Sequence, residues 1–360
     1  TWPTARDFNV GENRPGATFM LNQDEGYYKQ DEFTGAFELT AQITPDLTFR
    51  TNLSVDNRNQ TSRWFSGDYQ GRRNSDANAQ HWLWQYWQSE NYFNYSKTIA
   101  DHQITGLVGL SWSENKYDYV TASASKFSST FYQWNNLGAG SNPPTVGSSN
   151  TRGLLNSYFA RATYSYQGKY MLTATGRIDG SSKFGSNSKY GFFPSVGVAW
   201  RISQEGFMAD IKTISNLKLR ISAGQTGNQE IGNFITQTYI SNANVLLANG
   251  YNAGLYPGST GNDNLKWETT TQYDIGLDLG LIKGRISLTV DVYDKLTTDM
   301  LFNLPLPQST TTGSAYVNYG SVRNTGIELS LNTVNFQSQN FTWETLFTIA
   351  SNKNEIMELG

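Results

Sequence analysis

The chain has 360 residues, of which only 16% are charged and 14% are aromatic, and its formal net charge is −3. Low charge combined with many aromatic residues excludes a disordered chain, and the lack of a basic surplus argues against nucleic-acid binding. The sequence has no cysteine and only two histidines, His81 and His102. We therefore expect no metal site and no cofactor, and we expect an all-β protein.

A two-residue hydrophobic alternation runs along the chain and predicts about twelve strands. Between Tyr273 and Leu281, for example, apolar residues at odd positions alternate with Asp, Gly and Gln. Most predicted strands have ten or more residues, more than the usual length of about 5–6. Helix is predicted at most over 205–214. The strands are expected at 33–44, 47–56, 80–98, 102–115, 152–166, 169–180, 190–203, 216–225, 266–281, 285–298, 321–335 and 340–351.

The connections between these strands alternate in length. The short ones are 45–46, 99–101, 167–168, 204–215, 282–284 and 336–339. The long ones are 57–79, 116–151, 181–189, 226–265 and 299–320. Such sorting is typical of outer-membrane barrels, which have short periplasmic turns and long extracellular loops. A soluble sandwich that buries the same apolar face remains the alternative.

Aromatic residues near a short turn favour the membrane barrel. Tyr164, Tyr166 and Tyr170 bracket the predicted turn 167–168, where an interfacial aromatic belt is expected. The same reasoning makes 1–32 an extracellular loop and barrel lead-in, 33–351 the membrane strands, and 352–360 the start of the next extracellular loop. An open sheet with two unpaired edges cannot lie in lipid, so we expect this segment to belong to a larger barrel.

Several stretches resemble the SusC/RagA family of TonB-dependent outer-membrane transporters of Bacteroidetes-type bacteria. One contains Arg177-Ile-Asp-Gly-Ser-Ser-Lys-Phe-Gly185, and another contains Asn264-Leu-Lys-Trp-Glu268. Four such stretches in the family's order are a more specific sign of this family than any one stretch alone. The full set of similar stretches, in chain order, is 95–106 (weaker), 170–203, 217–232, 264–278 and 317–331.

The resemblance implies a barrel of about 22 strands with a plugged lumen. It also implies a plug domain, a TonB-contacting segment and pairing with a SusD-like lipoprotein. Measured against a whole member, this sequence lacks the plug, the TonB-contacting segment and the final strands, so it is expected to be the middle of the barrel. The implied function is TonB-dependent import of a nutrient across the outer membrane, foremost an oligosaccharide and in some members a peptide.

Two other functions stay open from the residues themselves. One is a passive outer-membrane pore, and the other is a soluble or surface-attached β-sheet protein that binds carbohydrate. An enzyme is not expected, because the sequence shows no catalytic constellation. The expected partners are the SusD-like lipoprotein, the TonB complex through the missing N-terminal part, an oligosaccharide or peptide ligand, and outer-membrane lipid.

Aromatic residues supply most of the predicted ligand contacts, because flat rings stack on the apolar faces of sugars. The alternative is an interfacial belt for the residues between 82 and 95, and packing within loops for the others. Charged residues of the polar strand faces, such as Arg177 and Asp179, are expected to solvate the lumen, to pair with a plug or to bind ligand. The candidate ligand-binding residues are Trp64, Trp82, Trp84, Trp87, Trp134, Tyr251, Tyr256, Arg177 and Asp179.

Overall fold

The computed structural model describes residues 24–67, 75–247, 250–307, 310 and 312–359. Strands dominate, and within these residues no helix is long and apolar enough to span a membrane. The strands are β1 (Asp24–Thr44), β2 (Leu47–Ser66), β3 (Asp76–Ile99), β4 (His102–Ser125), β5 (Thr145–Tyr166), β6 (Tyr170–Ser181), β7 (Tyr190–Arg201), β8 (Ile214–Asn228), β9 (Ile240–Leu247), β10 (Gly250–Pro257), β11 (Glu268–Leu281), β12 (Ile286–Thr298), β13 (Leu301–Pro305), β14 (Ser314–Asn318), β15 (Ser321–Gln337) and β16 (Thr342–Glu358).

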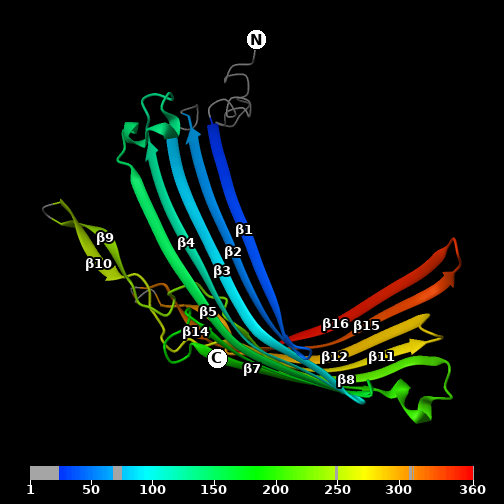
Figure 1. The fold of residues 1–360 in the computed structure, drawn as a ribbon. Helices are drawn as coiled ribbons and strands as arrows, with labels where there is room; N and C mark the ends of the chain where they lie inside the picture. Colours follow the sequence, from blue (N-terminus) through cyan, green and yellow to red (C-terminus); the bar gives the residue numbers. More distant parts are fainter. Residues whose placement is uncertain (1–23, 68–74, 248–249, 308–309, 311, 360) are drawn as a thin grey trace. The chain divides into compact units, whose positions relative to one another are not determined.

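Twelve of these strands form one sheet, which confirms the predicted number (Figure 1). Their order is β1-β2-β3-β4-β5-β6-β7-β8-β11-β12-β15-β16, so each strand lies beside its neighbours along the chain. This meander is the topology of up-and-down barrels. The remaining strands form two hairpins, β9–β10 and β13–β14, inside long connections. Neither hairpin was predicted.

The alternation of short and long connections is confirmed. Residues 45–46, 100–101 and 167–169 make tight turns, whereas β4–β5 and β8–β11 are joined by long segments. Gly168 has a φ of +65°, which glycine adopts without steric cost. The short turn of helix allowed over 205–214 is present as a single 3₁₀ turn, η5 (Gly206–Met208), and a second 3₁₀ turn, η4 (Ile202–Gln204), precedes it in the connection from β7 to β8.

Several strands extend further toward the long connections than predicted. β1 begins at Asp24 rather than at residue 33, so part of the predicted lead-in loop is strand, while 1–23 lie outside the described residues. β16 continues to Glu358, so the predicted loop at 352–360 is also mostly strand. β2 to β5 also extend further toward the long connections than predicted. In β1, residues 24–32 carry polar side chains or tyrosines on both faces, so the hydrophobic alternation is lost there while backbone pairing continues.

The strand register sorts side chains onto two faces. Ile275 pairs with Val292 and Leu277 with Val290, whereas Asp278 pairs with Thr289 on the other side. We call these the apolar face and the polar face of the sheet. Ile275 is 55% exposed. Extended exposure of large apolar side chains indicates a surface that contacts another apolar phase.

The described chain divides into two compact units that cut across the first five strands. Unit 1 comprises Thr1–Phe37, Leu53–Ser89 and Ser113–Gly153, and unit 2 comprises Glu38–Asn52, Glu90–Trp112 and Leu154–Gly360. Unit 1 therefore holds the parts of β1 to β5 that adjoin the long connections. Each unit is described by itself below.

The apolar face of β4 has a clear limit. In unit 2 this face carries Ile104, Val108, Leu110 and Trp112, and in unit 1 the same alternation places Glu114, Lys116 and Asp118 there. The segment from His102 to Trp112 measures about 33 Å at about 3.3 Å per residue, or about 25 Å once tilted as barrel strands are. That height matches the apolar band of outer-membrane barrels. We therefore call the part of the apolar face at the level of His102 to Trp112 the apolar band.

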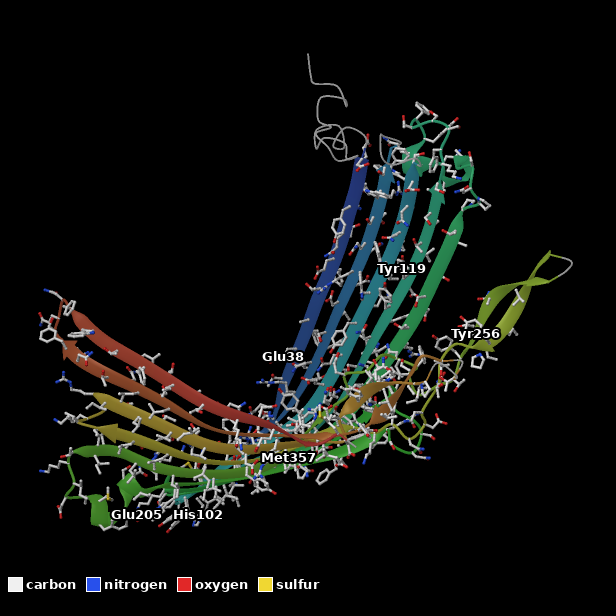
Figure 2. The ribbon with its side chains drawn as sticks, turned by 180° about the vertical axis from the view of Figure 1, so that it is seen from behind. Glu38, His102, Tyr119, Glu205, Tyr256 and Met357 are labelled. Atoms are coloured by element: carbon white, nitrogen blue, oxygen red, sulfur yellow. The ribbon has the colours of Figure 1, made fainter. Side chains whose placement is uncertain are left out.

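Aromatic side chains gather at the short-turn end of β5 to β7, as predicted. The Tyr170 ring lies parallel to those of Tyr166 and Trp200, with ring centroids 6.4 Å apart in each pair. The Tyr164 hydroxyl and the His102 Nδ1 atom are 2.7 Å apart. Glu205, in the connection after β7, joins this cluster (Figure 2).

Glu205 gives this cluster a pH dependence. Hydrogen bonds from the Tyr170 hydroxyl (2.6 Å) and the Trp200 indole (3.0 Å) lower the pKa of Glu205 below its ordinary value of 4.5. A lowered carboxylate pKa stabilises the folded state above that ordinary value, and the stabilisation is lost as pH falls through the folded-state pKa. We expect Glu205→Gln to lower the thermal midpoint of the full-length protein at pH 7, with the difference from wild type closing toward pH 3. Asp210→Asn, in the same connection, is the control; an unchanged difference at pH 3 would contradict the prediction.

Candidate functional site on the polar face

Four aromatic rings lie side by side on the polar face of unit 1. Trp82 stacks on Tyr119 with ring centroids 5.4 Å apart, and Trp84 packs on Tyr117 at 5.1 Å. Tyr117 and Tyr119 are nearly parallel, with an interplanar angle of 8°. Even positions of β3 and odd positions of β4 share one face, and this places all four rings together. We call these four residues the aromatic ladder; Tyr119 is marked in Figure 2.

Neutral polar groups continue the aromatic ladder toward the β3–β2 loop. Gln80 donates to the Tyr119 hydroxyl over 3.3 Å, and Asn78 donates to Thr121 over 3.2 Å. All four ladder rings are half-buried, so part of each remains accessible. Flat rings among amides and hydroxyls can stack on a ligand and orient its polar groups.

A polar hollow of about 280 Å³ adjoins the aromatic ladder at Trp84. Its other lining groups include Gln30, Gln60, Tyr86 and Asn115. All belong to unit 1. The hollow therefore presents amides and a phenol beside the indole ring. Such groups donate and accept hydrogen bonds without adding charge.

Two charged residues complete the polar hollow. The Arg58 guanidinium donates to Asp56 Oδ2 over 2.9 Å and lies 3.2 Å from a Glu32 oxygen. The other carboxylate oxygen, Asp56 Oδ1, is buried and has no hydrogen-bond partner among the residues described. A buried acceptor without a donor costs about 1–3 kcal/mol.

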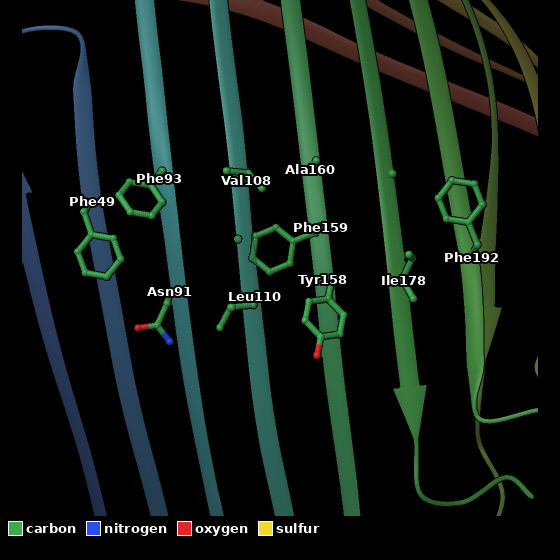
Figure 3. A pocket seen from close by; sticks show the side chains of 12 residues that line it. Phe49, Asn91, Phe93, Val108, Leu110, Tyr158, Phe159, Ala160, Ile178 and Phe192 are labelled. Carbon is green, nitrogen blue, oxygen red and sulfur yellow. The ribbon is translucent and has the colours of Figure 1, made fainter. Parts of the chain in front are cut away.

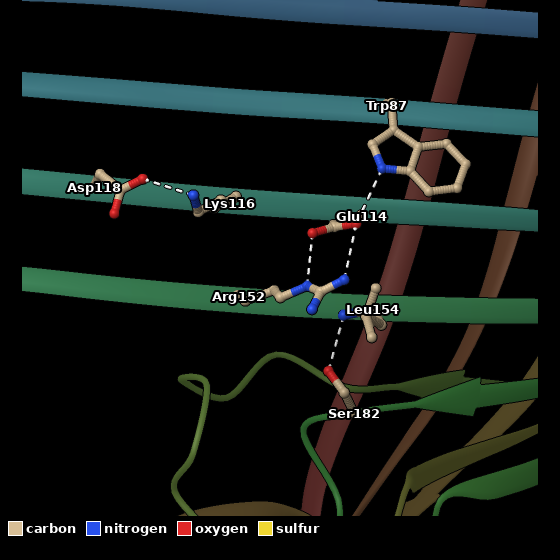
Figure 4. Close-up of polar contacts among 7 residues, drawn as sticks. All are labelled: Trp87, Glu114, Lys116, Asp118, Arg152, Leu154 and Ser182. Carbon is tan, nitrogen blue, oxygen red and sulfur yellow. Dashed lines mark hydrogen bonds and ion pairs between the residues drawn. The ribbon is translucent and has the colours of Figure 1, made fainter.

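Trp87 lies on the opposite face from Trp82 and Trp84. Its indole nitrogen donates to Glu114 over 3.0 Å, and Glu114 also accepts two hydrogen bonds from Arg152 at 2.6 and 3.2 Å (Figure 4). These contacts link β3, β4 and β5 at the edge of the apolar band. The structure thus separates Trp87 from the two tryptophans with which it was predicted.

Arg177 and Asp179 bind each other on the polar face of unit 2. Arg177 Nε donates to both Asp179 oxygens at 2.7 and 2.8 Å, and a terminal nitrogen donates to Ser157 over 2.8 Å. The guanidinium also lies 5.7 Å from the centre of the Phe159 ring. Asp179 is buried, whereas Arg177 stays partly exposed, so the cation of the pair is the group available to a ligand.

The remaining predicted residues lie on other elements. Trp64 belongs to β2 rather than to a loop, because that strand is longer than expected. Trp134 lies in η2 (Gln133–Asn135), between β4 and β5. Tyr256 is in β10 and exposed, and the side chain of Tyr251, in the same strand, lies outside the described part of the structure.

Sequence reasoning missed the partners that complete the site. Tyr117 and Tyr119 fell in a predicted loop, because β4 was expected to end at residue 115. The alternation of Asn115, Tyr117, Tyr119 and Thr121 was the signal that could have extended the strand. Nothing local marks Asp56 as a lining residue, since its place depends on the pairing of strands.

A buried apolar cluster fixes the roots of the long connections in unit 2. Trp267 packs on Phe184 and Phe193, with ring centroids 5.1 and 5.4 Å apart, and its indole donates to the Lys189 carbonyl over 3.0 Å. Leu265 and Ile231 complete this loop-root core. Its members come from the stretches 170–203, 217–232 and 264–278, so the sequence motifs that suggested a family meet in one cluster.

Close packing in the loop-root core requires glycine. A Cβ atom on Gly191 would lie 2.5 Å from the Phe193 ring, and one on Gly227 would overlap the same ring. The Phe193 side chain therefore occupies the space that these two residues leave free. This explains the glycines inside those stretches by packing rather than by backbone conformation.

An ion-pair group crosses the polar face of unit 2. Arg220 binds Asp278 through two hydrogen bonds of 3.0 and 3.1 Å and Asp291 through one of 2.8 Å. The guanidinium lies over Gly276, where an added Cβ would be 2.6 Å from the Arg220 Cζ atom. Gly276 therefore permits this arrangement.

Substituting Gly276 tests the ion-pair group. Gly276→Ala is expected to displace Arg220 and to destabilise the full-length protein by about 1–3 kcal/mol, as overpacking does, which a lower thermal midpoint would report. Gly106→Ala is the matched control, because a Cβ there meets nothing within 4 Å. Equal midpoints for the two variants would show that Arg220 moves aside freely.

Comparison with known proteins identifies the family. Residues 1–356 match the model of the "TonB dependent receptor-like, beta-barrel" family. The chain is 38% identical over 369 residues to TonB-dependent receptor P39 of Formosa agariphila, covering 99% of this chain and 33% of that protein. It is 38% identical over 215 residues to TonB-dependent receptor SusC of Bacteroides thetaiotaomicron, covering 58% of this chain and 21% of SusC.

A solved structure shows the same fold. The chain superposes on the RagAB peptide transporter with a TM-score of 0.89 and 26% identity, covering 98% of this chain and 40% of that one. This chain thus spans about a third of the P39 length and about two fifths of the RagAB chain. The soluble sandwich left open by the alternation is wrong, because the matching proteins are outer-membrane receptors and transporters. The chain belongs to the SusC/RagA family of TonB-dependent outer-membrane β-barrel proteins.

Proposed function

We propose that this chain forms barrel wall in a TonB-dependent importer of an oligosaccharide, working with a SusD-like lipoprotein. The aromatic ladder of Trp82, Trp84, Tyr117 and Tyr119 is the observation that carries the choice of substrate. It lies on the polar face, which lines the lumen in outer-membrane barrels, and beyond the apolar band on the side of the long loops.

The chemistry of the site suits a sugar. Pyranose rings have apolar faces that stack on indole and phenol rings and hydroxyl edges that bind amides and carboxylates. The polar hollow offers both, with the Trp84 ring beside Gln30, Gln60 and Asp56. Successive rings along β3 and β4 would allow an extended chain of sugars to be held in several registers.

A peptide is the second candidate substrate. Its support is the similarity to the RagAB peptide transporter. The Arg177–Asp179 pair, with its partly exposed guanidinium, is a group that a peptide carboxylate would bind. We favour the oligosaccharide because the aromatic ladder and the polar hollow present mostly neutral hydrogen-bonding groups.

The similarity to SusC and to the RagAB peptide transporter supports the proposed partners. A SusD-like lipoprotein is proposed to cover the extracellular mouth, and energy from the TonB complex is proposed to enter through parts of the protein outside this chain. Affinity purification of the full-length transporter from outer membranes is expected to co-purify one lipoprotein. Recovery of the transporter alone under mild detergent conditions would contradict the pairing.

Binding to the full-length transporter tests the proposed substrate class. Calorimetric titration with neutral oligosaccharides is expected to show binding, and titration with peptides of similar mass is expected to show none. Trp84→Phe should keep part of the affinity for oligosaccharide, because phenylalanine preserves a flat ring. Binding of peptides but not of sugars would replace this proposal with the second candidate.

A further inference from the structure

A hollow of about 690 Å³ lies on the apolar face of unit 2 (Figure 3). It extends across six neighbouring strands, from Phe49 on β2 to Phe192 on β7. At about 4.8 Å between strands, that is about 24 Å across the sheet. We call it the apolar hollow. It has no part in the polar-face site.

Small residues create the depression. Ala160 and Gly176 pair directly across β5 and β6 and have no side chain larger than a methyl group, and the Phe192 ring lies 3.4 Å from the position that a Cβ on Gly176 would take. Larger side chains border this floor. Phe49 and Phe93 pack with ring centroids 5.0 Å apart on one side, and Phe192 lies on the other.

The apolar hollow has a polar end and an apolar end. Asn91 and the Tyr158 hydroxyl lie at the end that faces the long connections, whereas Phe93 and Val108 lie nearer the short turns (Figure 3). The Thr51 hydroxyl donates to Asn91 over 2.8 Å and adds to the polar end. A ligand that matches this surface has its headgroup toward the long loops and its hydrocarbon toward the short turns.

We propose that the apolar hollow is a binding site for the acyl chains of an outer-leaflet glycolipid, the lipid A part of the outer membrane. The hollow is continuous with the apolar band, the surface that faces lipid in outer-membrane barrels. Its polar end faces the extracellular side, so the matching leaflet is the outer one.

Two further features favour lipid A. The hollow lies on inner strands and involves neither β1 nor β16, the ends of the sheet. Its width of six strands accommodates more than one acyl chain side by side, which suits a lipid with several chains. Asn91 and Tyr158 can bind the amides and hydroxyls at the root of those chains.

Retention of lipid by the full-length transporter tests this site. The protein is purified from outer membranes in mild detergent, washed and denatured, and the released lipid A is measured per mole of protein by mass spectrometry. Gly176→Phe fills the floor of the hollow, and Ala160→Leu fills it from the adjacent strand, in case the first variant does not fold. Ala174→Phe adds the same ring on the same strand and face, outside the lining residues, and is the control.

Wild type and Ala174→Phe are expected to retain lipid A. Gly176→Phe and Ala160→Leu should retain about tenfold less lipid A. Each larger side chain displaces about two methylene groups of the acyl chains from the protein surface. An unboiled and boiled gel pair confirms that each variant forms a barrel. Equal retention by all four proteins, retention of phospholipid in place of lipid A, or no retained lipid in the wild type would overturn the proposal. The proposal would also be overturned if Gly176→Phe or Ala160→Leu changed the oligomeric mass of the purified transporter while lipid A stayed bound.

Discussion

Trp84→Ala is expected to weaken oligosaccharide binding by the full-length transporter about 30-fold, which corresponds to about 2 kcal/mol for a central aromatic contact. The substitution removes a ring from both the aromatic ladder and the polar hollow. It also removes the tilted ring contact to Tyr117, which keeps only its stacking on Tyr119. Isothermal titration with the best-binding neutral oligosaccharide gives the affinity directly.

Trp87→Ala is the matched control. Trp87 lies on the same strand, three residues away, but it faces the other side of the sheet and binds Glu114. The affinity for oligosaccharide should stay within about twofold of wild type, since changes outside a binding site are worth at most about 0.5 kcal/mol. A larger loss of affinity from Trp87→Ala than from Trp84→Ala would place the ligand on the face of Trp87 and would contradict binding at the aromatic ladder.

Trp267→Ala is expected to destabilise the loop-root core by about 3–5 kcal/mol, the usual cost of removing a buried tryptophan. The variant loses the ring contacts to Phe184 and Phe193 and the hydrogen bond to Lys189. Because this core joins the roots of two long connections, the effect should appear there rather than in the membrane strands.

Limited proteolysis of the full-length protein in detergent measures that effect. We expect faster cleavage within 229–267 in Trp267→Ala, while the barrel keeps its shift between unboiled and boiled gel samples. Trp343→Ala removes a tryptophan that is 57% exposed on β16 and should leave the cleavage pattern unchanged. Loss of the gel shift in Trp267→Ala would mean that the core supports the whole barrel.

The sequence predicted the strands best where one face is apolar and the other polar. From Tyr273 to Leu281 the alternation is complete, and β11 matches the expected strand closely. Beyond the apolar band the rule fails, as β1 shows between residues 24 and 32, because polar residues occupy both faces there. Strand pairing in those extensions depends on neighbouring strands, which a local pattern does not contain.

The site was only partly predictable for the same reason. Trp82 and Trp84 stood out as aromatic residues, but Tyr119 is brought to Trp82 by the register of β3 and β4. The Arg58 and Asp56 side chains join them through the pairing of β2 with β3. The hairpin β9–β10 was missed because the short alternation within a long loop resembles many irregular segments.

Uptake by living cells tests the central claim most directly. Cells that carry the full-length transporter are given a fluorescent neutral oligosaccharide, with and without a functional TonB protein. We expect accumulation only when TonB is functional, and competition by unlabelled sugar but not by peptide. Uptake that persists without TonB would indicate a passive pore, and TonB-dependent uptake of peptide alone would show that the substrate is not a glycan.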